Sequence, residues 1–561
     1  MLLTASLGGA RNSFARWRRL RKASPLWSVV TAGILAVLIL PVATIIVLAL
    51  TPGISFSPGF ISSVLPEALL KTLLLMGLTG AACLFTGTCA AWLVTLYRFP
   101  GRSIADRLLV LPLAMPAYLT AYAYGDLLAY SGTLQTVLRA GFHLPAGAPA
   151  LLPDIRSLGG AVFVLSAALY PYVYLSARAS FLTQSVCALE VGRTLGRTPL
   201  GVFIAIALPM ARPALVAGTA LVVMECMADF AAVQYLGVPT LTPSIYATWL
   251  QRGNLGGAAR LAGVLLLLIA LMVAAERLGR GGAQSHNTTG RYRSVPFHEL
   301  TGAKGHAALA ACLVPVLLGF LLPAGVLLAN ALQHRAAILD DGFLPAARNS
   351  LLLAAATALT AMALAVFLSY ARRVAPNGLT RLGVALAGLG YALPGTVLAI
   401  GLLIPLGAFD NRLDAWMRAA FGVSTGLLLT GSLVSLTLAM VIRFLAVAMG
   451  AVESGLGRIS TNLDAAARAL GETPLSVLSR VHLPILVPAL ASGALLVFVD
   501  AMKELPATLL MRPFNFDTLA TRVYELSALE EFEQAAPGAL AIVVAGLVPV
   551  LALHRTLTRT S

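Results

Sequence analysis

Twelve apolar segments, each near the length that crosses a bilayer, constrain this chain more than any other feature. They lie near residues 27–50, 68–96, 108–130, 159–182, 212–236, 258–278, 307–332, 349–371, 382–408, 424–449, 487–511 and 536–556. A helix needs about 20 mainly apolar residues to cross the hydrocarbon core. Only helices and closed barrels satisfy every backbone polar group in lipid, and these segments show no alternation of period two. We therefore expect an all-α polytopic membrane protein with twelve transmembrane helices.

Composition agrees with this expectation and excludes other classes. Hydrophobic residues make up 58% of the chain and charged residues only 11%, which is too little charge to cover a water-facing surface. Soluble enzymes, nucleic-acid-binding proteins and secreted disulfide scaffolds are excluded. The five cysteines have no CxxC spacing, so neither a disulfide framework nor a metal site is indicated.

The distribution of basic residues predicts the orientation in the membrane. Lys and Arg are concentrated in the N-terminal tail, in the loops after the even-numbered spans and at the C-terminus. Cytoplasmic segments carry such an excess, so we expect both termini in the cytoplasm. Residues 1–26 then form a basic cytoplasmic tail, and the first span is a retained anchor because it is too long for a signal-peptide core.

The chain contains an internal duplication. Residues 190–218 align without gaps with residues 465–493, at a constant offset of 275, and share Leu-Gly-x-Thr-Pro-Leu, Leu-Pro and Pro-Ala-Leu. Upstream the offset is 278, as in Thr72 against Ser350. We predict two homologous six-span halves, 27–278 and 307–561, joined by a polar cytoplasmic linker at 279–306. Because six is even, both halves share one orientation, which makes this a parallel repeat with a pseudo-two-fold axis.

The best-matched part of the repeat is a cytoplasmic loop, at 185–215 and again at 455–490. Each copy predicts a short helix, a break at Gly196 or Gly471, a Thr-Pro turn that starts a second helix, and a Leu-Pro end. A single copy is also compatible with an ordinary elbow that returns the chain to the membrane. Two copies on one face favour docking of a partner that has two-fold symmetry.

This loop resembles the EAA loop of bacterial binding-protein-dependent ABC transporter permeases. The resemblance lies in Glu190-Val-Gly-Arg-Thr-Leu-Gly196 followed by Leu208-Pro209, and it departs from the family pattern at Val191 and Gly192. The second copy has Ala465 at the glutamate position and Asp464 one residue earlier. In that family the loop is a coupling helix seated in a groove of the ATPase subunit. The resemblance implies these coupling residues: Glu190, Arg193, Gly196, Pro199, Pro209, Asp464, Arg468, Gly471, Pro474 and Pro484.

The resemblance also implies partners and the place of nucleotide binding. The chain has no G-x-x-x-x-G-K-[ST] phosphate-binding loop. We therefore expect that it is not an enzyme and binds no cofactor. We expect ATP and Mg²⁺ to bind to separate ATPase subunits, present in two copies. The other implied partners are a periplasmic substrate-binding protein and the lipid membrane, with no nucleic acid.

Two acidic pairs repeat within the spans that follow the loops. Glu225 and Asp229 in the first half match Asp500 and Glu504 in the second half, again at an offset of 275. Carboxylates inside a bilayer are costly and usually face a pathway, so we assign them to the substrate pathway as a hypothesis. Structural pairing with Lys503, Arg512 or Arg522 is the alternative. No metal ligands are assigned.

One further segment points to a substrate. Residues 502–525 resemble a segment of ferric-iron permeases of the fused two-half type, which implies an importer for ferric iron. Permeases of the same type for thiamine, polyamines or phosphonates are alternatives. A proton-coupled secondary cation transporter is a further alternative from a different class, but such a protein would not need the repeated coupling loop.

Overall fold

The computed structural model describes residues 25–51, 58–143, 145, 149, 151–184, 192, 194–280, 298–334, 340–388 and 390–559. Within this part, eleven helices are long and apolar enough to cross a membrane, and one bent pair of helices raises the number to as many as twelve. The predicted all-α polytopic fold is confirmed. The chain packs as two units, Met1–Val47 with Leu351–Asn515 (unit 1) and Leu48–Ser350 with Phe516–Ser561 (unit 2).

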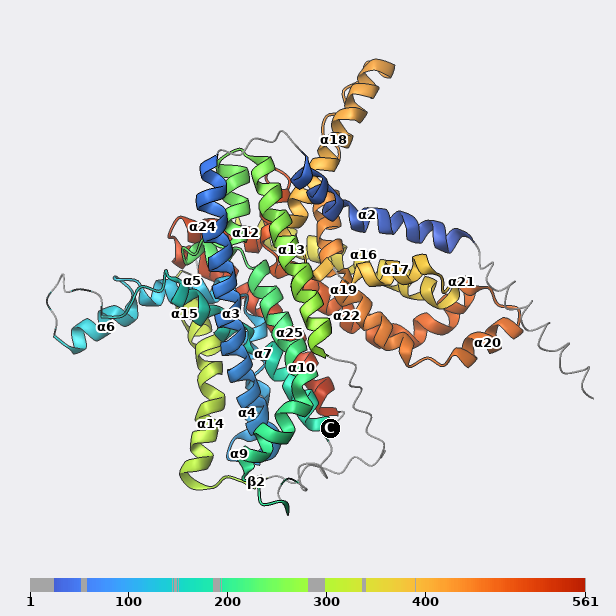
Figure 1. Ribbon diagram of the computed structural model, residues 1–561. Coiled ribbons are helices and arrows are strands. Elements are labelled where there is room, and N and C mark those ends of the chain that lie inside the picture. Colours follow the sequence, from blue (N-terminus) through green and yellow to red (C-terminus); the bar gives the residue numbers. More distant parts are fainter. Residues whose placement is uncertain are drawn as a thin grey trace, which may run out of the picture. The chain divides into compact units, whose positions relative to one another are not determined.

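Unit 2 contains most of the first half of the repeat and both ends of the second. Its helices and strands are α3 (Pro58–Leu96), β1 (Tyr97–Arg98), α4 (Arg102–Leu108), η1 (Leu111–Ala114), α5 (Ala117–Leu128), α6 (Thr133–Gly141), α7 (Leu158–Thr183), α9 (Pro199–Val202), η2 (Phe203–Ala207), α10 (Leu208–Ala228), α11 (Ala231–Tyr235), α12 (Leu241–Tyr246), η3 (Ala247–Gln251), α13 (Leu255–Arg280), β2 (His298–Glu299), α14 (Gly302–Val316), η4 (Leu317–Leu321), α15 (Leu322–Gln333), α24 (Leu519–Ala528) and α25 (Phe532–Arg559) (Figure 1). The strands β1 and β2 form a short parallel pair.

Unit 1 contains the centre of the second half and the first span of the chain. Its helices are α2 (Pro25–Leu50), α16 (Phe343–Val374), α17 (Gly378–Ala387), η6 (Gly390–Ala392), α18 (Gly395–Phe421), α19 (Leu433–Gly457), α20 (Thr461–Ala469), α21 (Pro474–Val477), η7 (Leu478–His482), α22 (Leu483–Lys503) and α23 (Pro506–Met511). The last turn of α2 and the first turns of α16 belong to unit 2.

The first span of each half packs with helices of the other half. In unit 1, the Trp27 ring of α2 stacks on Phe367 of α16 at a centroid distance of 5.1 Å, and the backbone of Pro41 lies against Gly401 of α18. In unit 2, the equivalent span α14–α15 packs on first-half helices, where the Tyr124 hydroxyl donates to the carbonyl of Leu318 over 2.7 Å. The sequence repeat and the packing therefore divide the chain differently.

The third predicted span, 108–130, is the bent pair. The segment Arg102–Ala114 meets Ala117–Gly141 at 93°. Met115 is extended, with ψ 119°, and Pro116 follows it with ψ 143°. Proline disfavours the helical conformation of the residue before it, and this explains why the helix breaks there.

The second half departs from the first beyond this point. In the first half, the separate helix α6 follows α5. In the second half, residues 411–421 are instead the continuation of α18 (Figure 1). Asp410 stabilises this arrangement, since its carboxylate accepts backbone N–H groups of Leu429 and Thr430 at 2.7–3.1 Å from the returning chain.

The duplication extends to individual hydrogen bonds. The Thr72 hydroxyl accepts the backbone N–H of Leu241 over 2.9 Å, and the Ser350 hydroxyl accepts that of Leu519 over 2.8 Å. Both residues of the second bond lie 278 positions after those of the first. Each bond ties the start of a span to a helix about 170 residues further along the chain, and the two halves therefore share a tertiary structure at these points.

Candidate coupling loops and intramembrane carboxylates

Both repeated loops turn at a glycine in the left-handed conformation. Gly196 has φ +77° and Gly471 has φ +84°. The backbone N–H of the next residue closes the turn on the carbonyl five residues back, Arg197 to Gly192 over 3.2 Å and Glu472 to Ala467 over 3.1 Å. This is the helix end for which glycine is preferred, because a Cβ is disfavoured at positive φ. The predicted break at each glycine is confirmed.

A Thr-Pro step starts the second helix of each loop. The Thr198 hydroxyl accepts the N–H of Gly201 over 3.1 Å, and the Thr473 hydroxyl accepts that of Ser476 over 3.3 Å. Pro199 and Pro474 are the first residues of α9 and α21, where the missing N–H costs no hydrogen bond.

The Leu-Pro ends of the loops are continuous with the spans rather than helix stops. Pro209 and Pro484 are the second residues of α10 and α22. A π turn, η2 or η7, precedes each of them. The wider π turn accommodates the proline ring without ending the helix. Each loop therefore runs directly into its membrane-spanning helix.

Four leucines, two from each loop, are strongly exposed at equivalent positions. Leu195 and Leu470 are 75% and 84% exposed, and Leu200 and Leu475 are 65% and 66% exposed. Their recurrence at equivalent positions of both loops makes them candidates for a contact surface. The sequence analysis missed these residues, although their identity in both copies was a signal that could have found them.

The second loop is held by an internal anchor, which consists of the side chains of Asp464, Arg373 and His482. An Asp464 oxygen in α20 lies 2.7 Å from Nε of Arg373 in α16, and the other oxygen lies 2.6 Å from Nε2 of His482 in η7. Arg373 also donates to the carbonyls of Leu456 and Ile459. His482 is fully buried and the Asp464 side chain is 11% exposed. Asp464 therefore contacts its own chain, and it holds the start of the loop against its end.

In the first loop, a neutral hydrogen bond reaches the residue that corresponds to His482. The Gln184 amide donates to the carbonyl of Ala207, which is equivalent to His482, over 2.8 Å. Two predicted coupling residues, Glu190 and Arg193, lie outside the described residues, as does the side chain of Arg468 in α20. Whether they contact a partner stays a prediction.

The second-half carboxylates have partners within unit 1. Asp500 lies 3.1 Å from Nζ of Lys503, as the structural alternative expected. Glu504 lies 3.2 Å from Nη1 of Arg443 in α19, and it also accepts the N–H groups of Ala507 and Thr508. Glu504 is 5% exposed. The sequence analysis missed Arg443, although a lone arginine inside an apolar span signals a buried carboxylate partner.

The first-half pair lies in unit 2 and has similar local geometry. Glu225 is in α10, and Asp229 is the residue just after that helix, with ψ 131°. The Asp229 carboxylate accepts the N–H of Ala232 over 2.9 Å at the start of α11. The second acid of each pair thus caps the short helix that follows it and does not continue the face of the preceding helix.

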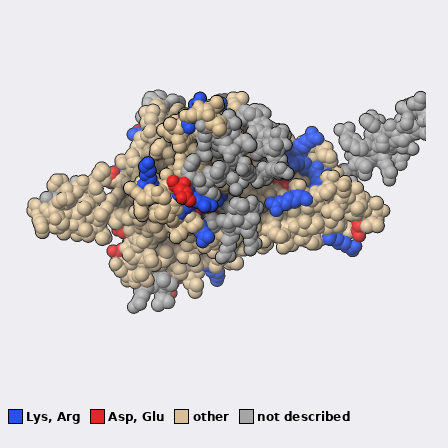
Figure 2. Space-filling model, turned by 90° about the horizontal axis from the view of Figure 1, so that it is seen from below, with Lys and Arg blue, Asp and Glu red and all other residues tan. Residues whose placement is uncertain are grey.

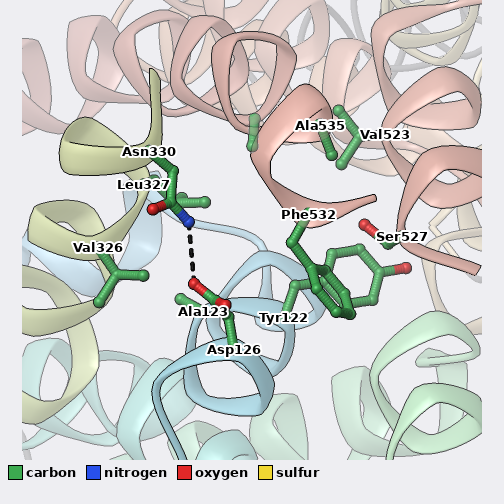
Figure 3. A pocket seen from close by; sticks show the side chains of 11 residues that line it. Tyr122, Ala123, Asp126, Val326, Leu327, Asn330, Val523, Ser527, Phe532 and Ala535 are labelled. Atoms are coloured by element: carbon green, nitrogen blue, oxygen red, sulfur yellow. Dashed lines mark hydrogen bonds between the residues drawn. The ribbon is translucent and has the colours of Figure 1, made fainter. Parts of the chain in front are cut away.

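Unit 2 also contains an acidic cavity of about 420 Å³ near the end of α5 and the start of α25. Its lining includes Asp126, Glu530, Glu531 and Glu533, together with Arg156. The Tyr235 hydroxyl, and then Glu530, raise the pKa of Arg156 by favouring its charged form. A small neighbouring cavity shares Asp126, whose carboxylate accepts the side-chain N–H of Asn330 over 2.9 Å (Figure 3).

In the described part of the chain, no three His, Cys, Asp or Glu side chains are grouped as a metal site would require. The four cysteines that lie in this part are free thiols. Asp229, Asp464, Asp500 and Glu504 are each held by hydrogen bonds or ion pairs within their own unit.

Comparison with known proteins finds permease proteins of transport systems. The Fe(3+)-transport system permease protein FbpB 2 of Haemophilus influenzae is 25% identical over 497 residues, which is 87% of this chain and 90% of that protein. The sulfate transport system permease protein CysT of Salmonella typhimurium is 29% identical over 35% of this chain and 70% of its own length. The molybdenum transport system permease protein ModB of Escherichia coli is 27% identical over 37% of this chain and 95% of its own length. No family model matches the chain.

The relatives thus include a full-length match and matches about the size of one half. This pattern agrees with the internal duplication, the parallel halves and the paired loops. The chain is therefore a multi-pass membrane protein that is similar, through both of its halves, to bacterial inner-membrane permeases of the ABC transporter type.

Proposed function

We propose that this chain is the membrane-spanning subunit of an ATP-driven importer for ferric iron. One observation carries the choice of substrate. The ferric-transport relative matches 87% of this chain, through both halves, whereas the sulfate and molybdenum relatives match 35% and 37%. The resemblance of residues 502–525 to ferric-iron permeases supports the same choice.

ATP hydrolysis occurs on separate ATPase subunits in this proposal, one docked on each coupling loop. The exposed leucines Leu195, Leu200, Leu470 and Leu475 supply an apolar contact surface on both loops. ATP and Mg²⁺ belong to those subunits, and this chain binds no cofactor of its own. Movement of a docked subunit is transmitted directly, because each loop is continuous with a spanning helix.

The loops and both termini face the cytoplasm in this proposal. The positive-inside distribution of the sequence supports this orientation. Seen from the end of unit 2 at which α4, α9 and β2 lie, more Lys and Arg than Asp and Glu side chains are visible (Figure 2).

A periplasmic binding protein delivers the ion at the opposite face. Ferric ion is a hard cation that prefers oxygen ligands, and the acidic cavity and the carboxylates of Glu225, Asp229, Asp500 and Glu504 supply them along the route. Transport then proceeds by alternating access. The ion is the cargo, and no resident metal site is required.

The test is uptake of radiolabelled ferric iron by cells that lack the chain, with and without the chain restored, and with ATP depleted in parallel. Restored uptake that requires ATP is expected. Restored iron uptake that is indifferent to ATP would contradict the ATP-driven mechanism and support a secondary cation transporter.

A permease of the same type for another solute is the second candidate. The sulfate and molybdenum relatives favour it, as does the shared architecture of thiamine, polyamine and phosphonate importers. In the same cells, ATP-dependent uptake of one of these solutes without any iron uptake would replace ferric iron as the substrate and leave the permease assignment intact.

A further inference from the structure

A second cavity, unrelated to the acidic one, lies in unit 2 between the start of α3 and the segment 239–252. Its volume is about 310 Å³. The polar groups in its lining are one carboxylate, Glu67, one guanidinium, Arg252, and the hydroxyls of Ser244 and Thr248. The lining therefore offers one negative and one positive charge, which is the complement of a zwitterion.

The internal repeat supplies a comparison for this cavity. The offset of 278 that relates the two Thr/Ser–Leu hydrogen bonds also relates Ser244 to Arg522 and Val64 to Gly342. In the second half, the Arg522 guanidinium lies so close to Gly342 that a Cβ there would collide with it, and it pairs with Asp340. The chain's own cation therefore occupies this place in the second half. In the first half a short serine replaces that arginine, and a cavity is present.

One wall of the cavity carries a hydroxyl whose hydrogen bonding is incomplete. Thr248 is 1% exposed, and its Oγ1 has no hydrogen-bond partner among the described residues. A buried polar atom without a partner is destabilising, by an amount comparable to a lost hydrogen bond. A polar ligand in the cavity would satisfy this hydroxyl after a small side-chain rotation.

The surface beside the cavity is apolar along α3. Leu70, Leu74 and Leu78 follow Glu67 at spacings of three, four and four residues, so they share one helix face with it. They are 56%, 41% and 50% exposed. On a membrane-spanning helix such a stripe suits acyl chains, and it begins one turn from the charged lining of the cavity.

We propose that this cavity binds the head group of a zwitterionic phospholipid that carries an ethanolamine amine. Arg252 holds the phosphate, Glu67 holds the ammonium group, and an acyl chain lies along Leu70, Leu74 and Leu78. The combination of a mixed-charge cavity with an adjoining apolar stripe selects a lipid over a small soluble zwitterion. Among the described residues of the second half, Arg522 fills the equivalent space.

The test is native mass spectrometry of the purified full-length chain titrated with phosphatidylethanolamine and, separately, phosphatidylglycerol. The wild type is expected to retain one phosphatidylethanolamine molecule, with an affinity about tenfold higher than that for phosphatidylglycerol. One charge-assisted hydrogen bond changes a dissociation constant by about that factor. Glu67→Gln removes the preference and leaves phosphate binding. Arg252→Gln lowers the affinity for both lipids by about tenfold. Arg412→Gln, which alters an exposed arginine outside the cavity, keeps the wild-type pattern.

A filling variant copies the second half. The double variant Val64→Gly, Ser244→Arg has the same residues at these two positions as the second half has at Gly342 and Arg522. It is expected to bind no lipid in the cavity. Val64→Gly alone is the control and should still bind the lipid. If the filling variant fails to fold, Thr248→Val tests the site instead, because it replaces only the hydroxyl by a methyl group. It is expected to lower the fraction of protein that retains the lipid. Wild-type retention in the filling variant, equal binding of the two lipids, or displacement by soluble phosphoethanolamine would each overturn the proposal. The readout does not depend on the transported substrate.

Discussion

At the scale of single residues, the ion pair between Arg443 and Glu504 is the most sensitive charge arrangement in unit 1. Both side chains are nearly buried, at 12% and 2% exposure. Arg443→Gln leaves the Glu504 carboxylate without its countercharge, and removing one partner of a buried pair costs about 3 kcal/mol or more. We expect a clear drop in the thermal unfolding midpoint of the purified protein, and partial recovery when Glu504→Gln is added.

Lys503→Gln provides the matched control for this experiment. Lys503 and Asp500 are 21% and 29% exposed, so their pair contributes about 0–1 kcal/mol. If the thermal unfolding midpoint of Arg443→Gln were as high as that of Lys503→Gln, the buried pair of Arg443 and Glu504 would not stabilise the unit.

Asp229 allows the pathway hypothesis to be separated from a structural role. Asp229→Asn keeps a side-chain oxygen that can accept the Ala232 N–H, because asparagine caps helices as well as aspartate does, and it removes only the charge. If the carboxylate serves the pathway, ion uptake falls while the unfolding midpoint is unchanged. Full uptake by this variant would assign Asp229 a capping role alone.

At the scale of elements, the positive φ of the two loop glycines predicts how coupling fails. Gly196→Val together with Gly471→Val forces side chains into the left-handed region, at a cost of about 1–2 kcal/mol for each. No atom lies within 4 Å of a Cβ at either place, so the change distorts the turn without a clash. We expect normal membrane insertion with loss of uptake.

Gly450→Val is the control for the glycine variants, since Gly450 lies within the α19 helix and also has open space around a Cβ. It should transport normally. Wild-type uptake by the double loop variant would contradict the coupling role of both turns.

The second loop is held by the Asp464 anchor and the first loop by a neutral hydrogen bond of Gln184. We therefore predict different effects when each of these interactions is removed. Asp464→Asn leaves Arg373 without its countercharge and should cost about 3 kcal/mol, whereas Gln184→Ala removes one neutral hydrogen bond worth about 1 kcal/mol. We expect ATP hydrolysis by the assembled transporter to continue in the Asp464 variant with less transport per ATP. Equal ratios of transport to hydrolysis in the two variants would contradict this asymmetry.

Sequence reasoning identified the elements well where local chemistry determines them. The glycine turns, the Thr-Pro helix starts and the spans follow from backbone preferences of the residues themselves. The break at Pro116 was missed because its apolar neighbours continue the hydrophobic run, which carries no information on bending. The partners Arg443 and Arg373 were missed because they come from other helices, and spacing along one segment does not reveal tertiary contacts.

At the scale of the whole molecule, the exchange of first spans makes each sequence half incomplete by itself. Unit 1 needs α2 from the first half, and unit 2 needs α14, α15, α24 and α25 from the second. We predict that a chain divided within the linker 279–306 transports when both fragments are made together, and that each fragment alone is degraded. Co-purification through a tag on one fragment, followed by uptake, measures this.

Stable accumulation of the first fragment alone would contradict the prediction. A control cut within the α7 helix should abolish transport even when both pieces are present, because it interrupts a helix that packs closely along α3. The sequence repeat could not reveal the exchange, since similarity between halves says which segments are equivalent and not which segments are neighbours.

The exchange also has a consequence for the timing of synthesis. Roughly 300 residues separate the end of α2 from the helices against which it packs, which begin at Leu351. At a ribosomal rate of about 5–20 residues per second, α2 waits roughly 15–60 seconds in the lipid before its neighbours emerge. Unit 2 is completed only when α25, the last helix, leaves the ribosome. A message truncated before the codon for Asn515 therefore yields no finished unit, and quality-control proteases can recognise such products by their unpaired helices.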